Sequence, residues 1–150
     1  MDANPGYELI GAVVGTANVF QRESQRLFRP HGISAAQFNV LNLLGATPEG
    51  QSQRELSDAL VVDRSNITGL LDRMEEAGWV KRMPVPGDRR AHRVVLTVAG
   101  RKLWDEILPR YLEVVAQVTA GLKKAEMAAS LGVLRHLELG AAKWSLPEAK

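Results

Sequence analysis

Polar side chains, most of them short, gather on one side of a helix that the sequence predicts over residues 64–77, opposite apolar residues at helical spacing. They are Ser65, Asn66, Thr68 and Arg73, and Gly69 lies among them on the same side. Short polar groups and one long cation suit close contact with base edges and phosphates. Glycine in mid-helix costs about 1 kcal/mol relative to alanine, so close approach of DNA or tight packing on another helix must compensate for Gly69.

Two arginines, Arg89 and Arg90, follow at the tip of a predicted basic hairpin. Narrow A·T-rich minor grooves concentrate negative potential and attract arginine, so these residues are candidates to enter the minor groove. A solvated charged loop is the alternative. Asp88 beside them is unsuited to DNA contact, and we expect it to hydrogen-bond an arginine or the loop backbone and hold the tip in shape.

Arg54 is a further candidate for a phosphate contact because it lies near the N-terminus of the preceding predicted helix, where free N–H groups attract anions. An ordinary solvated surface arginine explains this residue equally well. Asp72, Glu75 and Glu76 occupy the later turns of the next helix, where phosphates would repel them. Only the first two turns of that helix are therefore expected to enter a groove.

The positive charge of the chain is concentrated around the hairpin. The formal net charge is only +2, but residues 79–102 contain seven basic residues and one acidic residue, Asp88. Such a local excess is typical of a nucleic-acid-binding surface. A winged helix that binds protein instead of DNA is the alternative, and the charge cluster argues against it.

Several function classes are disfavoured. The 150 residues contain no cysteine, which excludes disulfides, a zinc ribbon and a thiol-based redox switch. His31, His92 and His136 are far apart in the sequence, and no metal, paired-carboxylate or phosphate-loop motif accompanies them, so we expect no catalysis, metal or cofactor. Without a secretion signal or a membrane-length apolar run, the chain is predicted to be cytoplasmic and without a membrane partner.

Helices must position these side chains. The sequence predicts helices over residues 7–28, 35–44, 53–60, 64–77, 98–122 and 124–143. Ser34 with Gln37 and Ser52 with Glu55 form capping-box patterns at two of the N-termini, and Asp63 and Thr97 are expected to cap two more. Gly78 ends the helix that carries the polar residues. Seven residues of the two central helices are expected to face inward: Leu56, Ala59, Leu60, Ile67, Leu70, Leu71 and Met74.

The hairpin is predicted to have strands over residues 79–83 and 91–96 and a long loop between them. The loop contains two prolines and a glycine, which we expect to interrupt the hydrogen-bonded ladder. The two central helices then form a helix-turn-helix, and the hairpin lies beside it. Apolar stripes on the end helices exceed what this small core can cover, which favours a homodimer.

The hairpin residues Asp88, Arg90, Val94, Leu96 and Thr97 match the wing signature D-x-R-x-x-x-V-x-L-T. Residues 63–100 closely resemble the winged-helix domain of the MarR family of bacterial transcription regulators, and the helix order agrees along the whole chain. The resemblance implies a mainly α fold with a small β-hairpin wing. Residues 1–150 would then form a single unit, with a winged-helix DNA-binding region over 34–100 and dimerisation helices over 7–30 and 101–145.

The resemblance also implies a function and the residues that perform it. The protein would bind a palindromic operator in double-stranded DNA as a homodimer, usually for repression, and would often be released by a phenolic or other aromatic ligand. Five residues would serve the major groove by the family pattern: Arg64, Ser65, Asn66, Thr68 and Arg73. Arg90 and its neighbour Arg89 would serve the minor groove. The absence of cysteine disfavours peroxide sensing, and the absence of tryptophan from the first helix disfavours urate.

A ligand would bind in a cleft between the end helices and the winged domain, where the family binds its effectors. Five residues are candidates to line it: Phe20, Phe28, His31, Phe38 and Trp104. Ordinary core packing is the alternative for each, because aromatic residues at helical spacing usually pack against other helices.

Overall fold

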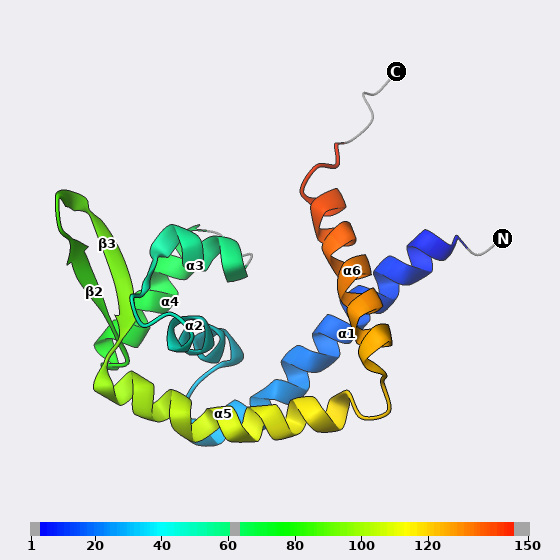
Figure 1. Cartoon of the computed structure of the whole chain (residues 1–150), viewed down its shortest axis with the longest axis horizontal. Helices are drawn as coiled ribbons and strands as arrows, with labels where there is room; N and C mark the ends of the chain where they lie inside the picture. The colour runs from blue at the N-terminus through cyan, green and yellow to red at the C-terminus, as the bar shows by residue number, and fades with distance from the viewer. Residues whose placement is uncertain (1–3, 61–63, 146–150) are drawn as a thin grey trace. The chain divides into compact units, whose positions relative to one another are not determined.

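The helices expected from apolar spacing and capping residues are present in the structure, a computed structural model that describes residues 4–60 and 64–145 (Figure 1). In chain order the elements are α1 (Pro5–Phe28), the 3-10 turn η1 (Arg29–His31), α2 (Ala35–Gly45), β1 (Gln51–Ser52), α3 (Gln53–Leu60), α4 (Arg64–Glu76), β2 (Val80–Val85), β3 (Asp88–Leu96), α5 (Val98–Val118) and α6 (Lys124–Ala141). The chain divides into two units, residues 1–112 and 113–150. The mainly α fold with a small β wing is confirmed.

Both predicted capping boxes are confirmed. Ser34 and Gln37 exchange side-chain to backbone hydrogen bonds of 2.8 and 3.2 Å at the start of α2. At the start of α3, the Glu55 carboxylate accepts from the backbone N–H of Ser52 at 2.6 Å, and the Ser52 hydroxyl accepts from the backbone N–H of Glu55 at 3.2 Å. The predicted cap Asp63 lies outside the described residues.

The junction between α4, the hairpin and α5 is held by Thr97. Its hydroxyl donates a hydrogen bond of 2.5 Å to the carbonyl oxygen of Gly78 and accepts one of 3.0 Å from the backbone N–H of Gly100. Thr97 therefore caps α5, as predicted. Gly78 has a φ of 76°, a left-handed conformation that favours glycine and ends α4 where the sequence places its end.

The core of the first unit forms mostly as expected. Ile67, Leu70, Leu71 and Met74 of α4 are buried, as is Leu56 of α3. The inward orientation predicted for Ala59 is wrong, because Ala59 is exposed and Ser57 is buried instead. The buried side of α3 is rotated toward Ser57, whose small side chain fits the interior and has an interaction partner there.

The long hairpin loop predicted over residues 84–90 is wrong. Strands β2 and β3 extend to Val85 and Asp88, and only Pro86 and Gly87 form the turn. Pro84 pairs with His92 inside the ladder, and the register shifts between Pro84 and Val85. The sheet order β1-β3-β2 explains this difference, because β2 is an edge strand in which the missing N–H of proline can point away from its neighbour.

Strand β1 was not predicted. Its two residues pair with β3, Gln51 opposite Val94 and Ser52 opposite Arg93. Gly50 before it is buried and has a φ of 78°, and a Cβ there would clash with the carbonyl oxygen of Val94. The close approach of this turn to β3 thus makes the hairpin continuous with the segment that enters α3.

The ends of the chain carry much exposed apolar surface within each unit. On α1, Phe28 is the single buried residue, whereas Tyr7 is 80% exposed and Val14 is 54% exposed. In the second unit, no residue among those described up to residue 145 is buried. None of the described helices combines the length and the apolar character needed to cross a membrane.

Candidate nucleic-acid interface

The polar side of α4 is open to solvent, because the opposite side carries the buried residues. Ser65, Asn66, Thr68 and Arg73 are exposed, and Gly69 is half-buried. The side chain of Arg64, which the sequence also assigns to this surface, lies outside the described part of the chain. The five described residues thus share one side of a single helix, as the sequence pattern requires.

A hydrogen bond joins α3 to α4 at this surface. The side-chain amide of Gln53 donates to the hydroxyl of Thr68 at 2.5 Å. Gln53 stands at the N-terminus of α3, so the bond links the first turn of that helix to the second turn of α4. The sequence did not predict this contact, because a hydrogen bond over 15 positions depends on how the two helices cross.

Gly69 makes no tight contact inside the described chain. A Cβ built at this position meets, as its nearest neighbour, the Arg73 guanidinium at 3.5 Å, an ordinary contact distance. Tight packing on another helix, one of the two explanations for this glycine, is therefore absent from the described residues. The remaining explanation is the approach of a partner from outside.

The two predicted arginines lie at the start of β3, next to the turn, and not in a loop at the hairpin tip as the sequence predicted. Arg89 and Arg90 are exposed, and within the described residues neither side chain makes a hydrogen bond or ion pair. The Asp88 carboxylate accepts a hydrogen bond of 2.9 Å from the backbone N–H of Arg90. Of the two partners that the sequence allowed for Asp88, the structure shows the backbone.

Three basic residues counted around the hairpin make contacts within the fold. Arg93 donates to the backbone carbonyl oxygens of Glu49 at 3.1 Å and Gly50 at 3.2 Å. Arg101 donates to the carbonyl oxygen of Gly45 at 3.1 Å and lies 5.0 Å from the ring centre of Trp104. Arg82 is the third.

Arg82 on β2 pairs with two carboxylates of α4. Its guanidinium lies 2.6 Å from Asp72 Oδ1 and contacts Glu75 Oε2, and its backbone N–H donates to Glu75 Oε1 at 3.0 Å. Partial burial is the largest influence on the guanidinium pKa and lowers it, but the hydrogen bonds and charges of Asp72 and Glu75 together raise the pKa above its ordinary value. Arg82 therefore stays charged.

The structure thus sorts the seven basic residues into two groups. Four are exposed, and their side chains make no hydrogen bond or ion pair within the described ranges: Lys81, Arg89, Arg90 and Lys102. The other three hold the fold together. Arg54, the candidate on α3, is largely exposed and lies 3.9 Å from Asp58 Oδ2, a distance at which a surface ion pair holds it only weakly.

Most of the predicted ligand residues pack against other side chains of the first unit. Phe28 and Phe38 are buried and stack with ring centres 4.6 Å apart, and Tyr111 adds a third ring 4.9 Å from Phe38. His31 Nδ1 lies 3.2 Å from Glu106 Oε1. These aromatic residues form a cluster at the junction of α1, α2 and α5.

The other two ligand candidates lie elsewhere. The indole N–H of Trp104 donates to Asn42 Oδ1 at 3.2 Å, and the ring covers Gly45 so closely that a Cβ there would lie 2.5 Å from Trp104 Cε2. Phe20 is 53% exposed on α1. The structure therefore does not gather the five candidates around one cavity.

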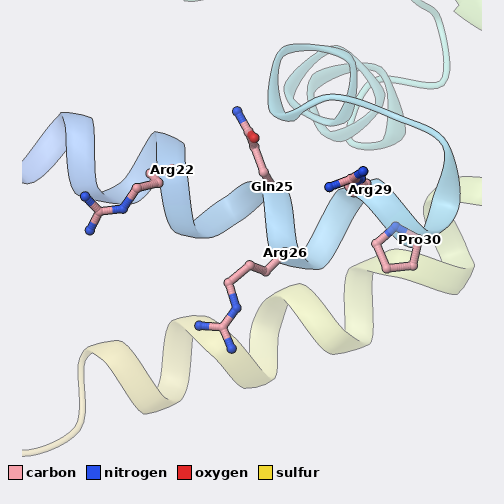
Figure 2. A pocket seen from close by; sticks show the side chains of 5 residues that line it. All are labelled: Arg22, Gln25, Arg26, Arg29 and Pro30. Atoms are coloured by element: carbon pink, nitrogen blue, oxygen red, sulfur yellow. The ribbon is translucent and has the colours of Figure 1, made fainter.

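A hollow on α1 and η1 has a different lining, shown in Figure 2: Arg22, Gln25, Arg26, Arg29 and Pro30. Glu23 accepts hydrogen bonds from Arg22 at 3.0 Å and from Arg26 at 3.1 Å. These two bonds, that of Arg22 first, lower the pKa of the Glu23 carboxyl. One carboxylate among three arginines leaves the hollow positively charged.

Comparison with known proteins agrees with this arrangement. Residues 31–91 match the model described as MarR family. The chain is 30% identical over 135 residues to the HTH-type transcriptional regulator PecS of Dickeya dadantii, an alignment covering 86% of this chain and 81% of PecS. It is 35% identical over 86 residues to the HTH-type transcriptional repressor NicR of Pseudomonas putida, over 57% of this chain and 54% of NicR.

Among solved structures, the chain is similar to CouR of Rhodococcus jostii RHA1, which was determined bound to p-coumaroyl-CoA. The TM-score is 0.73 with 26% sequence identity, and the match covers 93% of this chain and 95% of CouR. Both curated relatives are transcription regulators, not enzymes.

Proposed function

This chain belongs to the MarR family of DNA-binding transcription regulators, and from that premise we propose that it is a sequence-specific repressor that binds a palindromic operator as a homodimer. The observation that carries the proposal is the exposed polar side of α4 together with a hairpin whose strand β3 begins with two exposed arginines, Arg89 and Arg90, whose side chains make no hydrogen bond or ion pair among the described residues. The family membership supplies transcription regulation and DNA binding. The contacts, the dimer, the repression and the ligand are the proposal.

In this proposal the first two turns of α4 enter the major groove. Ser65, Asn66 and Thr68 approach base edges, Gly69 allows the backbone to come close, and Arg73 binds phosphate or base, together with Arg64. Arg89 and Arg90 enter the adjacent minor groove, and Asp88 holds the turn that presents them. Arg54 on α3 binds a phosphate.

A homodimer is supported by the exposed apolar residues at both ends of the chain. On α1 these include Tyr7, Ile10, Val14 and Phe20, each at least half exposed. In the second unit Val118 is 56% exposed and Leu131 is 53% exposed. Burial of such side chains stabilises an assembly by about 25 cal/mol per Å², and two-fold symmetry would present two α4 helices to the two halves of a palindrome.

We propose that the chain represses transcription, as the relative NicR, described as a repressor, does. We further propose that a small ligand releases the DNA, since CouR was solved with p-coumaroyl-CoA bound. The arginines of the hollow on α1 favour an anionic group on such a ligand. The place of action in this proposal is the cytoplasm, where bacterial DNA is found.

The test is a fluorescence-anisotropy titration of the purified chain with DNA from upstream of its own gene and with scrambled DNA over a salt series. Its mass in solution is measured alongside. We expect a dimer that prefers the upstream DNA strongly and loses affinity steeply as salt increases. Weak and equal binding to both, followed by no enrichment in a random-site selection, would contradict the proposal and favour a protein-binding adapter.

A further inference from the structure

Asp72 occupies the same side of α4 as the proposed DNA contacts. It follows Ser65 by seven residues, which is two helical turns, and its side chain is 59% exposed. Glu75, one turn further along, is 39% exposed at its side chain. The helix that approaches the DNA therefore carries two carboxylates directly behind its reading residues.

Carboxylates at this place oppose DNA binding. They repel backbone phosphates, and the repulsion reaches over a Debye length of about 10 Å at 0.1 M salt. When the first two turns of α4 lie in a groove, Asp72 directly follows the inserted residues and Glu75 lies one turn behind it, so both carboxylates come close to the phosphates that border the groove. Some feature of the fold must offset this repulsion.

The guanidinium of Arg82 lies against both carboxylates. One of its nitrogens is 2.6 Å from Asp72 Oδ1 and another contacts Glu75 Oε2. The backbone N–H of Arg82 also donates to Glu75 Oε1, so Glu75 is bound by two groups of one residue. The side chain of Arg82 is only 26% exposed, which leaves little of it to contact DNA.

We propose that Arg82 is a positioning residue for DNA binding, which acts by offsetting one of the two negative charges of Asp72 and Glu75 and by fixing β2 against α4. It raises DNA affinity without contacting DNA itself. This inference rests on the proposed placement of α4 in the major groove. It assigns a role to an arginine that a count of basic residues would take for a phosphate contact.

Two effects are combined in this role, and charge substitution separates them. If neutralisation matters, removing the two carboxylates compensates for the loss of Arg82, although no ion pair is restored. If Arg82 acts only as a structural tie, the same substitutions bring no recovery. Amide side chains keep the size of the carboxylates and change mainly their charge.

The experiment compares R82Q, the triple variant D72N/E75Q/R82Q and the matched control R110Q in anisotropy titrations with the DNA that the wild-type chain selects. Arg110 is exposed on α5, so R110Q removes the same charge and uncovers no carboxylate. We expect R82Q to bind about tenfold more weakly than R110Q, because the group of Asp72, Glu75 and residue 82 then carries two net negative charges close to the DNA and not one. The triple variant should return to within roughly threefold of R110Q by the same argument.

Two results would overturn the inference. One is an R82Q variant that binds as tightly as R110Q. The other is a triple variant that melts as cooperatively as the wild type and yet binds as weakly as R82Q. If R82Q does not fold, the variant D72N/E75Q, which keeps Arg82, tests the inference. It should bind DNA at least as tightly as the wild type. Binding that is tenfold weaker than that of the wild type would refute the role. Failure of the wild-type chain to select any DNA would instead refute the proposed function.

Discussion

The carboxylate of Asp88 accepts a hydrogen bond of 2.9 Å from the backbone N–H of Arg90, two residues along the chain. This bond fixes the first residues of β3 immediately after the Pro86-Gly87 turn, where the proposed minor-groove arginines begin. An acidic residue thus stands exposed beside the proposed DNA contacts because it holds the shape of the hairpin end.

The pair of variants Asp88→Asn and Asp88→Ala tests this role. Asparagine keeps an oxygen acceptor and removes the charge, so we expect preserved selectivity and somewhat tighter binding to all DNA. Alanine removes the acceptor as well, and a lost hydrogen bond of about 1 kcal/mol corresponds to about fivefold weaker specific binding. Titrations with selected and scrambled DNA measure both quantities. Equal selectivity in the two variants would leave the bond with no role in recognition.

Gly69→Ala should change stability and DNA affinity in opposite directions. Alanine in mid-helix is favoured by about 1 kcal/mol, and the new Cβ would meet only the end of the flexible Arg73 side chain at 3.5 Å. We therefore expect a higher melting temperature together with at least tenfold weaker operator binding, because the methyl group faces the groove. A variant that is more stable and binds DNA unchanged would show that nothing approaches this position.

Glu55→Gln should alter how stability depends on pH. Hydrogen bonds from Ser52, the backbone N–H first, and then the charge of Arg93 lower the pKa of the Glu55 carboxyl below its ordinary value of 4.5. A lowered folded-state pKa gives stabilisation that is fully present above pH 4.5 and is lost as the pH falls through the folded pKa. The variant should melt below the wild type at pH 7, and the difference should close toward pH 3.

A control for this prediction lies at the start of α2, where Gln37 forms the same capping box without a titrating group. Gln37→Glu should introduce a pH dependence of the same sign. Parallel melting curves for the wild type and Glu55→Gln from pH 7 to pH 3 would contradict the prediction.

Val14→Glu tests the proposed dimer. Val14 is 54% exposed on the apolar side of α1, and a buried charge at an apolar interface is strongly unfavourable. We expect the mass in solution to fall to that of one chain at micromolar concentration. Ala36→Glu adds the same charge at an exposed position of α2 and should leave the mass unchanged. A dimeric Val14→Glu variant would place the interface elsewhere.

The sequence predicts those parts of the fold that depend on local chemistry. Capping boxes, the glycine that ends α4 and the stripe from Ile67 to Met74 involve residues within one or two turns of each other, and all were expected correctly. The wing signature located the hairpin. Its tight turn was missed because whether Pro84 fits a ladder depends on which strand lies at the edge of the sheet, and sheet order is a long-range property.

The candidate site shows the same division. Helical periodicity predicts the exposed residues of α4. It does not predict the hydrogen bonds of Arg82 and Arg93, because their partners lie between 7 and 44 positions away in the sequence. The sequence did predict that Asp88 bonds an arginine or the loop backbone, because its partner, the N–H of Arg90, lies only two residues away. For the aromatic residues, spacing alone did not distinguish a ligand cleft from the Phe28–Phe38–Tyr111 cluster.

Strand β3 pairs with β1 on one edge and with β2 on the other, and β1 runs directly into α3. Arg93 ties the later part of β3 to the Gly50 turn, and Thr97, directly after the strand, ties its C-terminal end to the end of α4. The helix-turn-helix and the base of the hairpin therefore form one rigid unit, because hydrogen bonds join β3 both to the segment before α3 and to the end of α4. A bend at the base of the hairpin, next to Val94, would have to break the pairing of β3 with β1. In the proposed homodimer, an effector would therefore change the distance between two such rigid units, and that distance sets which spacing of operator half-sites the dimer fits.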